Sequence, residues 1–285
     1  MRIFRDIEGL KVWSLDQHNA SRRIGFVPTM GALHEGHLRL LKHAQSDCDV
    51  TVCSIFVNPT QFNDPNDLKK YPRPVAHDIE ILEDANCDVL FLPEVDEIYP
   101  NGSSDKKKFD FGQLDKVMEG FFRPGHFDGM AQVVDRLLEI LQPDKLFMGQ
   151  KDFQQLTIVR AMLRLTGRNT ELVTGATFRE KDGLAKSSRN IRLTSEHRKE
   201  ATLIYKTLKW AKKNASSLNF DDISSKAMKK LTRTDFKPEY FDIVDGITLQ
   251  KLNSIQDSDY IVACVACWVG EVRLIDNIII KDETE

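Results

Sequence analysis

Residues 26–41, Phe26-Val-Pro-Thr-Met-Gly-Ala-Leu-His-Glu-Gly-His-Leu-Arg-Leu-Leu41, decide the fold that this sequence predicts. The apolar residues 24–28 predict a short buried strand, and the apolar spacing after the turn predicts a helix. Gly31 and Gly36 allow the backbone to bend closely around a ligand. A helix that begins there directs its unpaired N–H groups and its positive end at that ligand. The turn is therefore suited to bind phosphate.

The rest of the chain extends this strand–helix alternation and then changes character. Up to residue 175, helical patterns separate strand-like runs at 50–57, 88–93, 145–148 and 171–174. Such alternation predicts βαβ units and a mostly parallel sheet, the α/β class. Beyond Gly183 come a charged helix at 195–214, with Ser195 as its expected N-cap, a helix near 223–231, and strand-like runs at 240–244, 260–269 and 271–280. We therefore expect two domains, residues 1–177 and a smaller α+β domain at 178–285.

Composition excludes several classes of protein. The 285 residues carry 40 basic and 43 acidic side chains, a formal net charge of −3, which argues against a dedicated nucleic-acid binder. The longest apolar run, residues 261–269, is far shorter than the ~18 residues that span a membrane. Five scattered cysteines form no disulfide framework. We expect a cytoplasmic enzyme with no membrane partner, in which Cys264 and Cys267 pack in a core although they form a C-x-x-C.

His34 and His37 are the first candidates for chemistry. Residues three apart on a helical turn share a face, so both imidazoles can donate hydrogen bonds to phosphate oxygens. They would then stabilise the charge that builds during attack on phosphorus. Two alternatives stay open: a metal-binding pair, for which no third ligand is evident, and an incidental pair of surface residues.

Two further strand ends carry polar side chains. Asn58 and Gln61 follow the run at 50–57, and Lys151, Asp152 and Gln155 follow the run at 145–148. Ligands of open parallel sheets bind outside the carboxyl ends of the strands. The amides suit a substrate with hydroxyl and carboxylate groups, the lysine suits phosphate and the aspartate suits a ribose hydroxyl. Each cluster alone could equally be an ordinary loop.

A fourth polar segment, Gly183-Leu-Ala-Lys-Ser-Ser-Arg-Asn190, lies where the two expected domains meet. Its hydroxyl groups and arginine are suited to closing over phosphates. The alternative is a polar loop between domains.

The motifs resemble those of a known family. His34-Glu-Gly-His37 resembles the H-x-G-H signature of the adenylate-forming nucleotidyltransferases, a superfamily that includes class I aminoacyl-tRNA synthetases, and Ala185-Lys-Ser-Ser-Arg189 resembles a degenerate form of its K-M-S-K-S signature. Over residues 24–280 the chain resembles the pantothenate synthetase (pantoate–β-alanine ligase) family. That resemblance rests on Pro28-Thr-Met-Gly-Ala-Leu-His-Glu-Gly-His37, Ile55-Phe-Val-Asn-Pro-Thr-Gln-Phe62, Tyr71-Pro-Arg73, Arg123-Pro-Gly-His-Phe127, Gly149-Gln-Lys-Asp-Phe-Gln-Gln155, Asp182-Gly-Leu-Ala-Lys-Ser-Ser-Arg-Asn190 and Arg273-Leu-Ile-Asp-Asn277.

The resemblance implies an ATP-dependent ligase with a Rossmann-like first domain, a smaller C-terminal lid and a homodimeric assembly. Pantoate would attack the α-phosphorus of Mg-ATP, giving pantoyl adenylate and pyrophosphate. β-Alanine would then attack the adenylate, giving pantothenate and AMP. In-line displacement at phosphorus needs positioning and charge stabilisation more than a protein nucleophile. No tightly bound organic cofactor is expected.

The resemblance also implies roles for particular residues. His37, His34 and Lys151 would be catalytic; Gln61, Gln155 and Asn58 would bind pantoate, and Gln61 also β-alanine. ATP would be contacted by Met30, Gly31, Ala32, Leu33, His34, Glu35, Gly36, His37, Gly149, Gln150, Lys151, Asp152, Phe178, Lys186, Ser187, Ser188 and Arg189.

Some positions depart from the family's pattern. Lys186 replaces a usual Met or Leu, Gln150 a usual Glu, and Pro74 a usual Thr. His77-Asp78 stands where a carboxylate pair associated with magnesium is found, so no protein metal ligand is expected and Mg²⁺ would arrive with the nucleotide.

Two other functions remain open from the sequence. One is a different nucleotidyltransferase that releases a stable nucleotidylated product. The other is a non-catalytic nucleotide- or tRNA-binding protein, although the short C-terminal unit offers a poor anticodon-binding domain.

Overall fold

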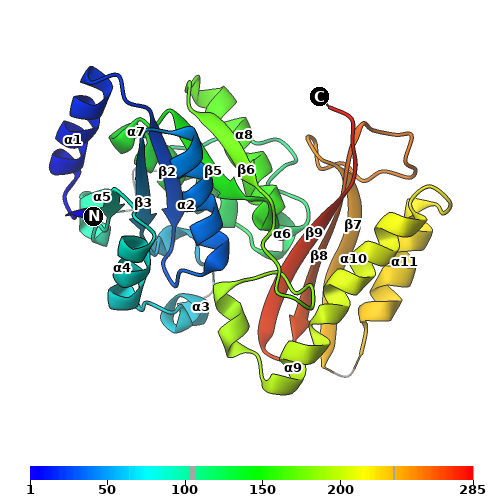
Figure 1. Ribbon diagram of the computed structural model, residues 1–285. Coiled ribbons are helices and arrows are strands. Elements are labelled where there is room, and N and C mark those ends of the chain that lie inside the picture. The colour runs from blue at the N-terminus through cyan, green and yellow to red at the C-terminus, as the bar shows by residue number, and fades with distance from the viewer. Residues whose placement is uncertain (64, 103–106, 234, 285) are drawn as a thin grey trace. The chain divides into compact units, whose positions relative to one another are not determined.

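The computed structural model describes residues 1–63, 65–102, 107–233 and 235–284, which form two compact units (Figure 1). Unit 1 comprises Met1–Phe111, Arg123–Gly149 and Ile158–Ala176, and unit 2 comprises Gly112–Phe122, Gln150–Thr157 and Thr177–Glu285. Two segments that precede residue 177 thus cluster with the C-terminal part of the chain. The division at residue 177 stays a prediction.

Unit 1 contains a six-stranded sheet in the order β1-β4-β3-β2-β5-β6, and every neighbouring pair is parallel. Its strands are β1 (Arg2–Phe4), β2 (Ile24–Thr29), β3 (Val50–Ile55), β4 (Val89–Phe91), β5 (Lys145–Gly149) and β6 (Glu171–Gly175). From β2 the chain proceeds to β3 and β4 on one side, and only later adds β5 on the other side. The carboxyl ends of β2 and β5 therefore flank the switch point of the sheet, where ligands of open α/β folds bind.

Helices cover both faces of this sheet. The helices of this part of the chain are α1 (Ile7–Asn19), α2 (Glu35–Asp47), α3 (Pro65–Lys70), α4 (Val75–Asp84), α5 (Val95–Ile98), α7 (His126–Leu141) and α8 (Phe153–Thr166), and the first residues of α8 belong to unit 2. Leu41 of α2 and Leu82 of α4 pack in one cluster with Ile55 and Leu90 of the sheet. Helix α7 is buried on almost all sides and contacts α1 and the 3-10 turn η1 (Pro59–Gln61).

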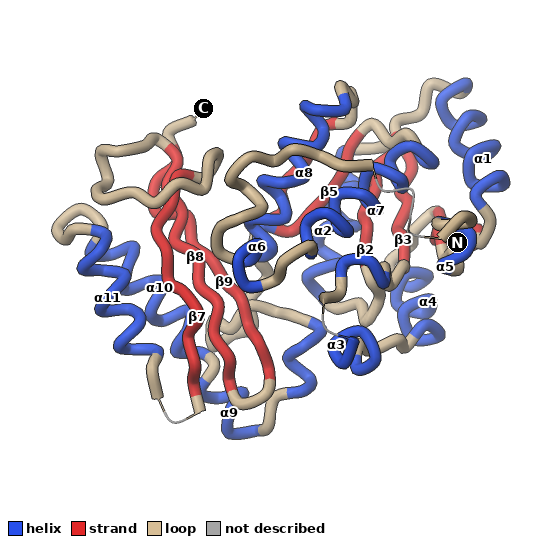
Figure 2. Tube along the Cα trace, turned by 180° about the vertical axis from the view of Figure 1, so that it is seen from behind, coloured by secondary structure: helices blue, strands red, loops and turns tan. Residues whose placement is uncertain are grey.

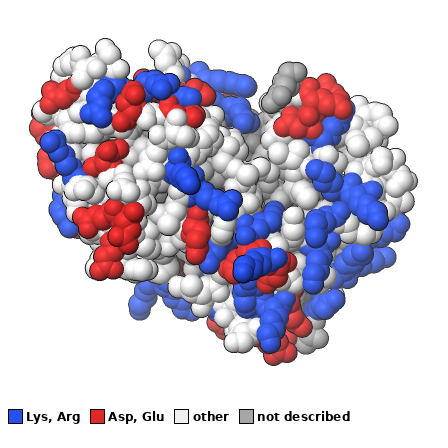
Figure 3. Space-filling view, viewed as in Figure 1, with Lys and Arg blue, Asp and Glu red and all other residues white. Residues whose placement is uncertain are grey.

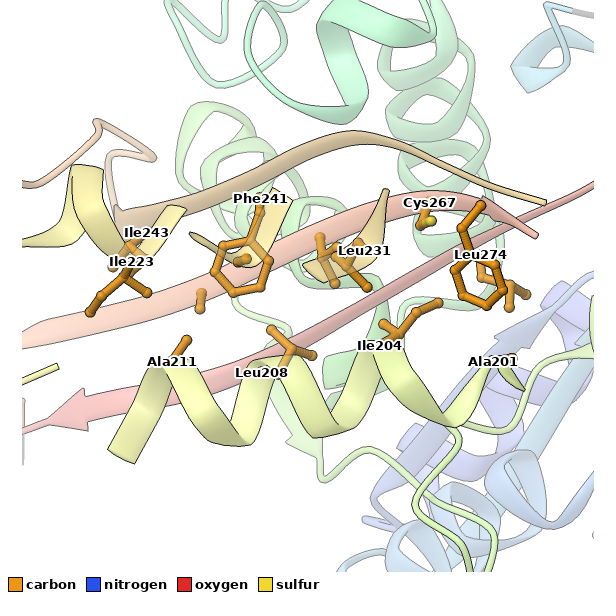
Figure 4. Packing of buried hydrophobic residues seen from close by; sticks show 14 of the residues in the cluster. Ala201, Ile204, Leu208, Ala211, Ile223, Leu231, Phe241, Ile243, Cys267 and Leu274 are labelled. Carbon is orange, nitrogen blue, oxygen red and sulfur yellow. The ribbon is translucent and has the colours of Figure 1, made fainter. Parts of the chain in front are cut away.

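Unit 2 is built on an antiparallel three-stranded sheet, β7 (Phe236–Asp245), β8 (Tyr260–Val269) and β9 (Val272–Asp282) (Figure 2). It also contains α6 (Glu119–Phe122), α9 (Ser195–Glu200), α10 (Thr202–Asn214), α11 (Phe220–Leu231) and the 3-10 turns η2 (Gln150–Asp152) and η3 (Ser188–Arg192). Apolar residues of α10 and α11 face the sheet, with Ile204, Leu208 and Ile223 opposite Phe241 and Ile243 (Figure 4). Lysines on the outer faces of these helices gather on the surface that Figure 3 shows.

The C-x-x-C cysteines lie on opposite faces of β8, as the prediction of core packing requires. Cys267 belongs to the cluster beneath α10 and α11, whereas Cys264 packs with Phe153 and Tyr240 on the other face. Burial raises the pKa of both thiols, that of Cys267 to about 12. All five cysteines are free thiols. The pair is therefore part of the core and no dithiol centre.

The fold class is confirmed, with differences in detail. The single helix predicted for 195–214 is two helices that meet at Ala201, and the N-cap is Thr194 rather than Ser195, because the Thr194 hydroxyl accepts from the N–H of His197. The short strand β1 was not predicted, because three residues with two exposed side chains show no alternation. Among the described residues, no helix has the length and apolar character needed to cross a membrane.

Candidate active site

The turn between β2 and α2 is held in an unusual backbone conformation by one buried carboxylate. Gly31 and Ala32 have φ angles of 78° and 50°. Asp78 of α4, fully buried, accepts from the N–H of Ala32 at 2.8 Å and of Leu33 at 2.7 Å. A Cβ on Gly31 would lie 3.0 Å from that carboxylate, so glycine also leaves room for it. Asp78 thus holds the backbone conformation of the turn that is predicted to bind phosphate.

The two histidines cap the start of α2. His34 is the N-cap residue, and its Nδ1 accepts from the N–H of Gly36 at 3.2 Å. Nδ1 of His37 accepts from the N–H of His34 at 3.2 Å, and the two rings stack with centroids 4.0 Å apart. A ring nitrogen that accepts a hydrogen bond carries no proton, so each neutral ring holds its proton on Nε2. The cap therefore makes both Nε2 atoms donors.

A second group of polar side chains lies in η1, after β3. The Nε2 amide of Gln61 contacts the sulfur of Met30 at 2.9 Å, which joins this group to the turn after β2. Nδ2 of Asn58 donates to Oε1 of Gln61 at 3.2 Å and to the carbonyl of Gly129 at 3.0 Å. Oδ1 of Asn58 accepts from the Tyr99 hydroxyl at 3.0 Å. The side chain of Asn58 is thus engaged within the protein and orients Gln61.

Helix α7 packs against η1 and holds the backbone of Gln61 in place. A Cβ on Gly129 would lie 2.3 Å from the carbonyl oxygen of Thr60, so only glycine lets η1 approach the helix this closely. Nδ1 of His126 is 2.8 Å from the carbonyl oxygen of Gln61, which only accepts, and Nε2 lies 3.2 Å from a guanidinium nitrogen of Arg123. His126 therefore carries its proton on Nδ1 and fixes the backbone of Gln61.

The segment after β5 turns through η2 into α8. Nζ of Lys151 lies 3.1 Å from both carboxylate oxygens of Asp152. Asn277 donates to the carbonyls of Gln150 and Lys151, both at 2.9 Å. Gln155, half-buried at the start of α8, has no side-chain hydrogen bond to any residue in the part of the chain that the structure describes. Its amide is therefore available to a ligand.

The fourth predicted segment forms a tight turn in unit 2. The N–H of Lys186 donates to the carbonyl of Phe178 at 2.9 Å, and Arg179 and Ala185 form an antiparallel bridge. Ser187 caps η3 by accepting from the N–H of Arg189. Nζ of Lys186 lies 3.3 Å from Glu180. Although burial opposes it, hydrogen bonds from Arg198 and Lys186 lower the pKa of the Glu180 carboxyl. Glu180 thus places a negative charge beside Lys186, a contact that the sequence did not indicate.

The predicted residues therefore fall into two groups, each held by its own unit. Unit 1 holds the stretch Met30–His37, Asn58, Gln61 and Gly149, and unit 2 holds Gln150–Asp152, Gln155, Phe178 and Lys186–Arg189. The carboxyl ends of β3, β2 and β5 are neighbours in the sheet, so within unit 1 the polar residues that follow β3 and β2 lie at the same edge as Gly149.

Sequence reasoning missed the residues that support these groups. Asp78, Tyr99, His126 and Asn277 contact the candidate residues through backbone groups or buried side chains. His126 and Asn277 do lie in motifs that carried the resemblance, but spacing alone gave them no role. Among the described residues, no cluster of three His, Cys, Asp or Glu side chains is arranged to hold a metal ion.

Comparison with known proteins decides the family. The family model described as pantoate–β-alanine ligase matches residues 2–279. The chain belongs to the pantoate–β-alanine ligase family. Membership makes it an ATP-dependent ligase, as predicted from the motifs.

Relatives and solved structures of the ligase family agree along the whole chain. The pantothenate synthetase of Azobacteroides pseudotrichonymphae is 47% identical over 98% of this chain and 99% of the relative, and that of Bacteroides thetaiotaomicron is 45% identical over 99% and 100%. The crystal structure of pantothenate synthetase from Thermus thermophilus superposes with a TM-score of 0.91 at 37% identity, covering 99% of this chain and 100% of that one. The ligase from Francisella tularensis, complexed with β-γ ATP and β-alanine, gives 0.82 at 38% identity over 98% of each chain.

Proposed function

We propose that the chain condenses (R)-pantoate with β-alanine through a pantoyl adenylate, releasing pyrophosphate and then AMP. The observation that carries this proposal is the reciprocal cap of His34 and His37, which holds two Nε2–H donors at the N-terminus of α2. Donors fixed before the reaction stabilise developing charge without reorganising, which is what displacement at phosphorus requires. Family membership supports the choice of carboxylate and amine.

In the first step, the pantoate carboxylate attacks the α-phosphorus of ATP and pyrophosphate leaves. We assign stabilisation of the developing charge to His37, His34 and Lys151, with the N–H groups of the turn at Met30–His37 contacting the nucleotide. Gly149, Gln150, Asp152 and Phe178 would contact its ribose, phosphates and adenine, and Lys186, Ser187, Ser188 and Arg189 its phosphates. For Lys151 and Lys186 this requires phosphate to replace Asp152 and Glu180 as partner.

In the second step, the amine of β-alanine attacks the acyl carbon of the adenylate and AMP leaves. Gln61 and Gln155 would hold pantoate, and Gln61 would also contact β-alanine. We assign Asn58 to the orientation of Gln61, because both of its amide hydrogens are already donated within the protein.

Mg²⁺ enters this proposal only as part of the nucleotide substrate. Both carboxylate oxygens of Asp78 accept hydrogen bonds from backbone N–H groups, so this side chain does not fit a metal ligand.

We further propose that the protein is a homodimer that acts in the cytoplasm. Five free thiols are typical of a protein in a reducing compartment.

AMP release tests the function directly. Purified protein with ATP and pantoate should form AMP continuously only when β-alanine is added, and should exchange labelled pyrophosphate into ATP without it. A stable nucleotidylated product would instead indicate another nucleotidyltransferase. ATP binding without turnover of any carboxylate would indicate a non-catalytic nucleotide-binding protein.

Gln155→Ala is expected to raise the KM for pantoate about tenfold or more, with a smaller effect on the KM for ATP. A hydrogen bond to a charged group contributes about 1.5–3 kcal/mol, and this amide has no competing partner among the described residues. Gln17→Ala, at a half-buried glutamine of α1, is the matched control and should leave both constants unchanged. An unchanged KM for pantoate in Gln155→Ala would remove Gln155 from the pantoate site.

Asp78→Asn is expected to lower the rate of ATP–pyrophosphate exchange by about 10²-fold, the order expected when a reacting group is displaced by 1 Å. The amide cannot accept from both Ala32 and Leu33, so one N–H of the turn loses its partner. Glu80→Gln changes an exposed carboxylate of the same helix and should exchange at the wild-type rate. A loss below threefold in Asp78→Asn would show that the turn keeps its conformation without the carboxylate.

A further inference from the structure

Strand β9 carries two adjacent polar residues whose side chains are buried. Asp276 is 4% exposed and Asn277 is 2% exposed. Their contacts lie on two different segments of unit 2, Gln150–Asp152 and the turn from Phe178 to Lys186. Neither residue belongs to the groups to which we assigned contact with substrate.

Asn277 holds the peptide groups on both sides of Lys151. Its Nδ2 donates to the carbonyl of Gln150 and to the carbonyl of Lys151, each at 2.9 Å, and its Oδ1 accepts from the side-chain amide of Gln150 at 3.1 Å. One carbonyl belongs to the peptide that precedes Lys151 and the other to the peptide that follows it. Fixing both peptides fixes the direction in which the Lys151 side chain leaves the backbone.

Asp276 holds the other segment through Arg179. The guanidinium of Arg179 makes two hydrogen bonds to the Asp276 carboxylate, at 2.6 and 2.9 Å, and also donates to the carbonyls of Asn277 and Gly183. It stacks 3.9 Å from the centroid of the Tyr205 ring. Because Arg179 directly follows Phe178 and bridges Ala185, this pair fixes the start and end of the turn that leads to Lys186.

We infer that Asp276 and Asn277 are positioning residues that hold two nucleotide-binding segments, each through its own side chain, at a fixed place on one strand. Asn277 orients Lys151, and Asp276 orients the turn from Phe178 to Lys186 through Arg179. The inference rests on the proposed function, in which both segments bind ATP. Neither side chain touches a reacting atom.

Two variants of Asn277 test the inference in the full-length protein. Asn277→Ala removes all three hydrogen bonds, and Asn277→Asp keeps the shape but faces two carbonyl oxygens with a carboxylate. The KM for ATP, the KM for β-alanine, the rate of ATP–pyrophosphate exchange and the urea midpoint of unfolding are measured for each. If Asn277→Asp does not fold, Asn277→Ser, which keeps one donor, replaces it.

Leu274→Ala is the matched control, since Leu274 lies on the same strand and packs in the apolar cluster beneath α10 and α11. It should lower the urea midpoint and keep the wild-type KM for ATP and exchange rate.

The Asn277 variants should lower kcat/KM for ATP in the exchange reaction by about tenfold or more, as misplacement of a charged group does, while the KM for β-alanine stays within twofold. Folded variants with wild-type exchange kinetics would overturn the inference, and so would a change in exchange no larger than that of Leu274→Ala. An inactive wild-type protein would instead overturn the proposed function.

Discussion

Replacement of His37 by alanine is expected to lower kcat for adenylate formation by about 10²–10³-fold, the loss that follows removal of one preorganised donor to developing charge. The reason is geometric: Nδ1 of His37 accepts from the N–H of His34, so the proton of the neutral ring is on Nε2. ATP–pyrophosphate exchange, which reports the first step alone, is the measurement. His43→Ala, an exposed histidine of the same helix, is the control and should retain wild-type kcat.

Two further variants separate catalysis from capping, because His37 also accepts from the backbone N–H of His34, the N-cap residue of α2. The side-chain oxygen of asparagine lies near the position of Nδ1, so His37→Asn keeps an acceptor for the cap and loses the Nε2 donor. The side-chain nitrogen of glutamine lies near the position of Nε2, so His37→Gln keeps a donor. We expect His37→Asn to be as inactive as His37→Ala but more stable by about 1 kcal/mol, the contribution of a cap.

The ordering of these variants is the decisive result. His37→Gln should be the most active of the three. A fall of less than tenfold in His37→Ala would remove the catalytic role of His37, and equal activity of the asparagine and glutamine variants would show that the cap rather than the donor matters.

Local pattern was enough to predict the elements that carry the site. The strands within 24–28 and 50–57 are buried along almost their whole length and show no alternation of exposed residues, because both faces of the sheet are covered, and Gly31 marks a turn that needs a positive φ. Parallel strands then require the polar residues after each run to lie on the same edge. The sequence was therefore enough to predict this edge. It was not enough to predict the order of the strands, because that order depends on which helices pack on which face of the sheet.

The residues that support the site could not be predicted from spacing. Asp78 acts on backbone N–H groups 45 and 46 positions away, and which N–H groups point at it depends on the φ angles of the turn. The polar amide of Asn58 predicts a contact with substrate. Only the structure shows that this amide already donates to the carbonyl of Gly129 and accepts from the hydroxyl of Tyr99. Lys186 stays a predicted phosphate contact, but its ion pair with Glu180 could not be predicted, because it depends on the turn that places the two side chains together.

Replacement of Arg273 by methionine is expected to lower the free energy of unfolding by about 3–5 kcal/mol, the range for removing one partner of a buried ion pair. Arg273 donates to both carboxylate oxygens of Glu119 at 2.7 Å and to Glu239 at 2.7 and 2.9 Å. Burial lowers the pKa of Arg273, but the hydrogen bonds and charge of Glu119, joined by Glu239, outweigh it and raise that pKa. Methionine would leave the buried carboxylate of Glu119 and the half-buried carboxylate of Glu239 beside each other without this cation.

A variant of Tyr240 distinguishes the contribution of the Arg273 cation to stability from that of the other hydrogen bond to Glu119. Its hydroxyl donates to Glu119 at 2.9 Å, and burial, followed by the charge of Glu119, raises its pKa well above the ordinary value. Tyr240→Phe removes one hydrogen bond to a charged group and should cost about 1.5–3 kcal/mol, less than Arg273→Met. Arg136→Met is the control, because its ion pair with Glu139 is exposed and such pairs contribute about 0–1 kcal/mol.

The same network reaches the candidate site through Glu119. The N–H of Glu119 donates to Oε1 of Gln154, and Nε2 of Gln154 donates to the carbonyls of Leu114 and Val117. Arg273 thereby fixes the segment Gly112–Phe122 against the first turn of α8, where Gln155 lies. We therefore expect Arg273→Met to raise the KM for pantoate at temperatures where the protein is still folded. Urea unfolding and pantoate kinetics on one preparation test both effects, and a loss of stability below about 1 kcal/mol would show that the two glutamates are accommodated without the arginine.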